Sequence, residues 1–166
     1  REEQAVQARL RYASHDTSEV ALGVNHALGD GPDPRHFARL DISRTASNGY
    51  MDRNRREATS TAFSLLSDLT PRLSHTLALE YLEEQEHSPY WGSPILNPVG
   101  GTMKIDKRRR FDNYNVADGR YEQRVHWLRS IIDYQLDDAT SLHNTLYQYA
   151  GQRDYRNIEN YRYNAD

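Results

Sequence analysis

The sequence contains no cysteine, which excludes disulfide bridges and thiolate-metal sites. It also lacks an uninterrupted apolar run of roughly 18 residues, the length that a membrane-spanning helix requires. Positive charge is in no excess, because 21 Lys and Arg residues stand against 24 Asp and Glu residues, for a net charge of −3. A general nucleic-acid binder usually carries a strongly basic face, so this composition argues against that class.

Aromatic residues are what the sequence has in quantity. Only 37% of its residues are hydrophobic, yet it holds 12 Tyr, 2 Trp and 3 Phe among 166 residues. Disordered chains are polar but poor in aromatics. A chain of this length is sufficient for one folded domain, and we therefore expect a folded chain with many tyrosines on its surfaces.

The dominant pattern is an alternation of apolar and polar residues. It begins with Val6, Ala8, Leu10 and Tyr12, which are separated by polar side chains. A period of two residues is typical of β-strands with one apolar face. The alternating segments cover residues 6–12, 20–24, 38–42, 59–67, 74–84, 120–136 and 140 to at least 149. The pattern predicts an all-β fold, an antiparallel up-and-down meander of about seven strands.

The connections between these segments differ in length. Those after the second, fourth and sixth segments are short, whereas long polar stretches follow the third and the fifth, the latter over about 85–118. Only the first connection, at 14–18, is short on the long-loop side. Short turns at one end and long loops at the other are typical of bacterial transmembrane barrels, whose strands are about 9–11 residues long. A soluble β-sandwich shares the alternation, and the pattern alone leaves both folds open.

A lipid-facing strand must present an uncharged face. Ala38, Leu40 and Ile42 meet this requirement, and Leu128, Ile132 and Tyr134 meet it with an interruption at Ser130. Helix is the alternative for 57–69 and 121–134. The first stretch has no consistent apolar stripe, and the second is rich in residues that favour strands, so we predict strands for both.

Several stretches resemble the start of the barrel in TonB-dependent outer-membrane siderophore receptors of the ferrichrome-receptor group. They follow one another in that family's order over nearly the whole chain and cover residues 10–17, 38–44, 69–77, 89–94 and 110–115. The resemblance implies that residues 1–166 form a single segment of a transmembrane β-barrel in the bacterial outer membrane. The family's plug domain and TonB-binding segment have no counterpart among these residues, and its complete barrel has about 22 strands.

The resemblance also implies a function and partners. The full-length family takes up ferric siderophores with energy from TonB, which acts through an N-terminal region, and it contacts outer-membrane lipid and lipopolysaccharide. It uses no cofactor; the ferric siderophore is the transported ligand. The alternatives are a soluble β-sheet module that uses loop 85–118 for ligand recognition, and a small structural β-barrel.

Two groups in the long loop are candidate binding residues. By resemblance, Tyr90 and Trp91 correspond to aromatics that contact the siderophore near the barrel mouth; the alternative is that they pack the loop or lie in an interfacial aromatic girdle. The basic run at the end of this loop comprises Lys107, Arg108, Arg109 and Arg110. It is a possible attractor of anionic chelates or lipopolysaccharide phosphates, against the alternative of a solvated loop surface.

Catalytic and metal-site motifs are not found in the sequence. Glu83, Glu84, Glu86 and His87 are close together, but their spacing matches no established metal motif. There is no Gly-x-Ser-x-Gly sequence and no phosphate-binding Gly loop. We therefore predict that the protein is not an enzyme and holds no metal of its own.

Overall fold

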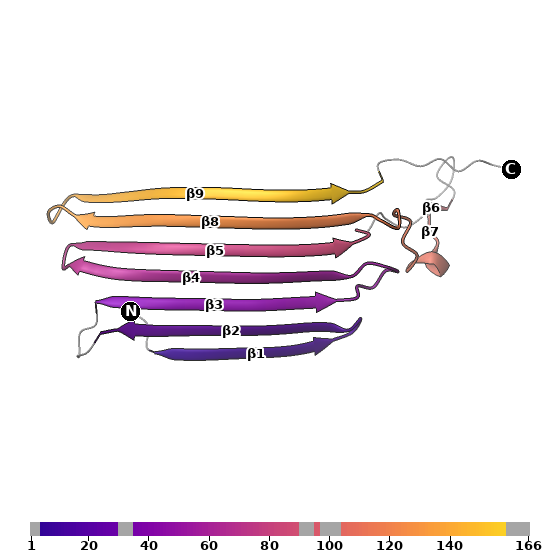
Figure 1. The fold of residues 1–166 in the computed structure, drawn as a ribbon, viewed down its shortest axis with the longest axis horizontal. Helices are drawn as coiled ribbons and strands as arrows, with labels where there is room; N and C mark the ends of the chain where they lie inside the picture. Colours follow the sequence, from indigo (N-terminus) through magenta and orange to yellow (C-terminus); the bar gives the residue numbers. More distant parts are fainter. Residues whose placement is uncertain (1–3, 30–34, 90–94, 97–103, 159–166) are drawn as a thin grey trace.

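The computed structural model describes residues 4–29, 35–89, 95–96 and 104–158. Its main feature is one antiparallel sheet of seven strands, each hydrogen-bonded to the next along the chain (Figure 1). The strands are β1 (Ala5–Ala13), β2 (Thr17–Leu28), β3 (His36–Ser47), β4 (Arg56–Thr70), β5 (Leu73–His87), β8 (Arg120–Gln135) and β9 (Ser141–Arg156). The predicted all-β meander is confirmed. The sheet is not closed, because β1 and β9 have no strand partner on their outer edges within the described residues.

Both stretches for which helix was the alternative are strands, β4 and β8. The only helical element in the described part of the chain is one short 3-10 turn, η1 (Lys107–Arg109). No helix among the described residues is long and apolar enough to cross a membrane. The tight β1–β2 turn is built on His15 and Asp16, whose φ angles of 60° and 51° match the two positive values of the turns that suit twisted hairpins.

The two ends of the sheet differ. The β1–β2 turn and the connections 48–55 and 88–119 lie at one end, which we call the long-loop end. At the opposite, short-turn end, β2 ends and β3 begins, and the connections 71–72 and 136–140 join the next two pairs of strands (Figure 1). The expected long loop begins after His87 and ends before Arg120, and it contains a small second sheet of β6 (Ile95–Leu96) and β7 (Lys104–Ile105) that the sequence pattern did not predict.

Strand register sorts the side chains into two faces, because successive residues of a strand point to opposite sides. On the apolar face, one row of paired residues runs through Val24, Leu40, Phe63, Leu79 and Leu128. On the polar face, the neighbouring row runs through Gly23, Asp41, Ala62, Glu80 and Trp127. In these two rows one face of the sheet is thus apolar, whereas the other carries acidic, small and aromatic residues.

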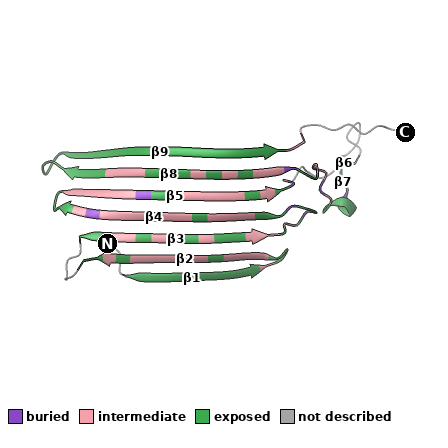
Figure 2. Cartoon of the chain, viewed as in Figure 1, coloured by how far each residue is buried: buried purple, intermediate pink, exposed green. Residues whose placement is uncertain are grey.

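The described residues contain almost no hydrophobic core. Met51 and Ala78 are the only buried hydrophobic residues among them. The apolar face is open instead: Leu10 is 81% exposed, Val6 72% and Leu146 71%. Figure 2 shows β1 and β9 exposed along nearly their whole length. The sheet is therefore held together by its strand ladders, and its apolar face has no cover from the described residues.

Candidate functional site

The buried polar residues gather at the long-loop end. Connections 48–55 and 88–119 contain nearly all of the buried described residues, namely Met51, Asn54, Ser88, Asp106, Asn113, Asn115 and Gly119. Apart from Met51 and Gly119, all of these residues are polar, so the two connections are joined by hydrogen bonds rather than by apolar packing. We call this cluster the loop knot.

Side-chain amides fold the long connection onto itself. The Asn113 Nδ2 donates to the Ser88 carbonyl at 2.7 Å, and the Asn115 Nδ2 donates to the Pro89 carbonyl at 2.7 Å. The Ser88 amide donates to the Gly119 carbonyl at 2.7 Å. These bonds close the base of the connection, because they hold its first residues, Ser88 and Pro89, against its last ones, from Asn113 to Gly119.

The shorter connection is tied to the longer one by Arg53 and Asn54. The Arg53 guanidinium donates to the carbonyls of Asn113 at 2.7 Å and Asn115 at 3.2 Å. The Asn54 Nδ2 donates to the Ser88 carbonyl at 3.4 Å and also to the Glu86 Oε1 of β5 at 2.8 Å. Because these groups are part-buried, their bonds are less exposed to competition from water than surface contacts. The two loops therefore form one structural unit above β3, β4, β5 and β8.

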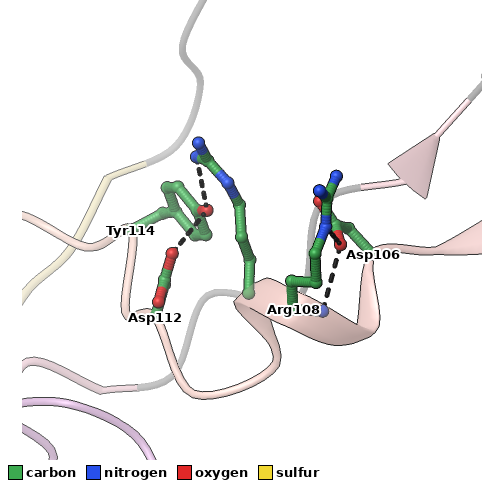
Figure 3. A network of polar contacts seen from close by, with 5 residues as sticks. Asp106, Arg108, Asp112 and Tyr114 are labelled. Carbon is green, nitrogen blue, oxygen red and sulfur yellow. Dashed lines mark hydrogen bonds and ion pairs between the residues drawn. The ribbon is translucent and has the colours of Figure 1, made fainter.

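The basic run lies on the outside of this unit. Lys107, Arg108, Arg109 and Arg110 are all exposed, and the first three make up η1. Buried Asp106 caps that turn, since its Oδ1 accepts from the Arg108 amide at 3.0 Å and pairs with the Arg108 guanidinium at 3.5 Å (Figure 3). The basic run that the sequence predicted thus lies on the loop surface, and its first three residues form a 3-10 turn.

Acidic and phenolic groups surround these cations. The Arg109 guanidinium donates to the Tyr114 hydroxyl at 3.3 Å, which in turn donates to the Asp112 Oδ2 at 3.2 Å (Figure 3). The hydrogen bond to Tyr114 raises the pKa of Arg109 above its usual value. The Arg110 guanidinium lies 4.6 Å from the centre of the Phe111 ring. Local partners therefore offset part of the positive charge of Arg108 and Arg109, and the predicted attraction of anions to this run stays a prediction.

The other candidate residues do not converge. Tyr90 and Trp91 lie outside the described residues, so their predicted contact with a siderophore stays a prediction. Glu83 and Glu84 fall on opposite faces: Glu83 pairs with Arg124 at 3.0 Å, whereas Glu84 pairs with Arg56. Within the described ranges, no group of three or more His, Cys, Asp or Glu side chains is placed to hold a metal ion.

Sequence reasoning missed two features of the polar face. An open cleft beneath the loop knot is lined by Thr45, Ser47, Gly49, Asn54, Arg56, Ala58 and Glu86. Farther along the sheet, Trp127 of β8 lies edge-on to Tyr147 and Tyr149 of β9, with ring centres 6.4 and 6.1 Å apart. The sequence predicted many tyrosines on the surfaces, without assigning these two to a face. Alternation along the strand could have placed Tyr147 and Tyr149, because their odd positions put them on the face opposite to Leu142 and Leu146.

Comparison with protein-family models, with characterised proteins and with solved structures yields no match to this chain.

Proposed function

We propose that this chain forms part of the wall of a bacterial outer-membrane β-barrel, in a TonB-dependent receptor for ferric siderophores. The observation that carries the wall assignment is the apolar face, which is exposed although it bears large aliphatic side chains. Leu22, Ile42 and Leu79 are 43%, 41% and 45% exposed. A water-soluble sheet would cover such a face with a second layer, whereas acyl chains can cover the wall of a barrel.

The position of the apolar run along each strand supports this assignment. The run is centred between Ala8 and Leu10 in β1 and between Ser130 and Ile132 in β8. The register places the second centre three side-chain rows closer to the short-turn end, across five strand-to-strand steps. Three rows span about 20 Å and five steps about 24 Å.

This displacement makes the apolar band run diagonally across the sheet at about 40°. Strands of transmembrane barrels tilt by roughly 35–45° from the membrane normal, and a flat slab of lipid then crosses them on such a diagonal. The row through Leu10 illustrates the change: it is aliphatic in β1 and β2 and becomes charged at Arg44, Glu83 and Arg124. A soluble layer gives no reason for such a tilt.

Two of the polar groups that interrupt the apolar face, His75 and Ser130, are partners of each other. His75 Nε2 and Ser130 Oγ are 2.8 Å apart and share a hydrogen bond across β5 and β8. In lipid, an unpaired polar group costs several kcal/mol. The interruption at Ser130, which weakened the sequence pattern for a lipid-facing strand, is therefore compatible with the proposed face.

The receptor part of the proposal rests on the sequence resemblance and on the loops. Long loops gathered at one end suit an extracellular mouth, and the sequence resemblance assigns Tyr90 and Trp91 of the long connection to that mouth. We propose binding of the ferric siderophore there, contact of the outer wall with lipid and lipopolysaccharide, and coupling to TonB through a region outside this sequence. We propose no catalytic activity and no resident cofactor.

The wall assignment is tested by spin labels, because the chain has no cysteine of its own. Leu65→Cys and Leu77→Cys place a label on the apolar face, and Ser64→Cys and Thr76→Cys place matched labels on the polar face one residue away. In lipid vesicles, labels on the apolar face should be relaxed more strongly by oxygen, which dissolves in lipid. Labels on the polar face should be relaxed more strongly by a water-soluble nickel complex. Equal access of the nickel complex to both pairs would refute the wall assignment.

Binding of the siderophore is tested separately by fluorescence. In a Trp127→Phe variant, Trp91 is the only tryptophan, and a ferric siderophore should quench its emission saturably. The matched Trp91→Phe variant, which reports from Trp127, should show only the linear loss caused by light absorption. Identical curves for both variants would contradict the role of the long loop in siderophore binding and leave the wall assignment standing.

A further inference from the structure

The polar face of β8 and β9 carries a continuous line of aromatic and guanidinium groups, which we call the β8–β9 aromatic track. Its members are Tyr121, Trp127, Arg129, Tyr147, Tyr149, Arg153 and Tyr155, all on the same face by register. Tyr121 and Tyr155 lie edge-on with ring centres 6.0 Å apart near the long-loop end. From Tyr121 to Trp127 the track extends for about 20 Å along the strands.

A glycine sets the orientation of the central ring. A Cβ added to Gly151 would lie 2.9 Å from the Tyr149 hydroxyl and 3.3 Å from the ring carbon that bears it. The Tyr149 side chain therefore lies along β9, over the space left by the missing side chain of Gly151, and does not project away from the sheet. In this position the ring is a platform on the surface, and Tyr149 is 58% exposed.

Two guanidinium groups extend the track without giving it a strong charge. Arg129 lies 5.1 Å from the centre of the Trp127 ring and is paired with Glu80. Arg153 lies 5.3 Å from the centre of the Tyr121 ring, and its Nη2 donates to the Gln123 Oε1 at 3.0 Å. The positive charge of Arg129 is offset by its carboxylate partner, so the track offers planar donors beside rings rather than a convergent cationic site.

Neither face of a barrel wall needs this arrangement for stability. An interfacial aromatic girdle lies on the lipid-facing side, whereas the track is on the charged side. Cross-strand ring pairs stabilise a sheet, but Trp127, whose strand has a neighbour on each side, remains 38% exposed. Exposed aromatic surface rimmed by polar groups marks interaction sites.

We propose that the β8–β9 aromatic track binds uncharged oligosaccharides, a ligand class beyond the proposed uptake of siderophores. The C–H faces of a sugar ring are apolar and pack on aromatic faces, while its hydroxyls lie at the ring edge. The neighbouring tyrosine hydroxyls, guanidiniums and Glu80 carboxylate are suited to donate to and accept from those hydroxyls. The length of the track and its partly offset charge match a neutral chain better than a compact polyanion.

The test uses Trp127 as the reporter in a Trp91→Phe background, with the full chain in detergent or lipid. Maltohexaose should shift the Trp127 emission saturably, and sorbitol, which has hydroxyls but no ring, should not. Tyr149→Ala should weaken binding roughly tenfold, the effect of losing one aromatic contact worth about 1.4 kcal/mol. Gly151→Val should do the same by displacing the Tyr149 ring while keeping all aromatic groups.

The matched control is Tyr134→Ala, which removes a tyrosine from the opposite face of β8. Its affinity for maltohexaose should equal that of the parent, and circular dichroism should show the same strand content for all variants. The proposal is overturned if millimolar maltohexaose leaves the emission unchanged, or if Tyr134→Ala weakens binding as much as Tyr149→Ala. It is also overturned if 2,3-dihydroxybenzoate, an anionic aromatic, binds in preference to the sugar.

Discussion

At the scale of single residues, the loop knot depends on amide groups that have one correct orientation. The buried Asn113 Nδ2 donates to the Ser88 carbonyl at 2.7 Å, and the Asn113 Oδ1 accepts from the Asn115 amide at 3.0 Å. Asn113→Asp keeps the shape but sets a carboxylate oxygen against that carbonyl. We expect a loss of about 1–3 kcal/mol of local stability, seen as faster protease cleavage within 88–119. Lys107→Ala, an exposed change in the same loop, should leave the cleavage rate unaltered; equal acceleration would contradict this role.

A second residue-scale prediction concerns acid and the β8–β9 turn. The Asp137 Oδ1 accepts from the Ala139 amide at 2.9 Å, and this bond, with those from Thr140, lowers the pKa of Asp137 below its usual value. A lowered folded-state pKa means that the turn is stabilised above the ordinary carboxyl pKa and loses this support as pH falls through the folded value. The Ala139 amide proton should therefore shift upfield in NMR spectra on acidification. In Asp137→Asn that shift should disappear; persistence would assign it to another group.

At the scale of elements, the alternation of side chains was sufficient to predict the seven strands, but their ends were harder to predict. β9 continues to Arg156 although its last residues are polar, because their pairing with β8 extends the ladder. The β6–β7 pair and the loop knot could not be predicted, since Asn113, Ser88 and Arg53 are far apart in sequence and no period relates them. The faces of Tyr147 and Tyr149 followed from parity, but their contacts with Trp127 depended on the register between strands.

The apolar face gives the element-scale prediction. Leu65 of β4 is near the middle of the apolar run, and its neighbour Ser64 points to the polar face. Leu65→Arg should destabilise the chain in lipid vesicles by about 2–4 kcal/mol, the cost of a charge near the bilayer midplane. Ser64→Arg should cost far less, because its guanidinium joins an already charged surface. Urea unfolding monitored by tryptophan emission measures both; equal losses would argue against lipid on one face only.

At the scale of the whole molecule, the open sheet leaves two long edges. β1 and β9 present backbone groups without a strand partner within the described residues, and such edges pair with other strands. Two copies of the chain should therefore associate edge to edge when no other strand covers them.

Val6 of β1 and Phe63 of β4 share one row of the apolar face, one on an edge strand and one between two neighbours. Under oxidising conditions in detergent, Val6→Cys should form disulfide-linked dimers, and Phe63→Cys should stay monomeric because β3 and β5 keep the backbones of two copies apart. Dimers of Phe63→Cys at an equal rate would point instead to face-to-face association of the apolar surfaces. Added lipid should abolish that face-to-face association, whereas edge-to-edge pairing should persist in lipid.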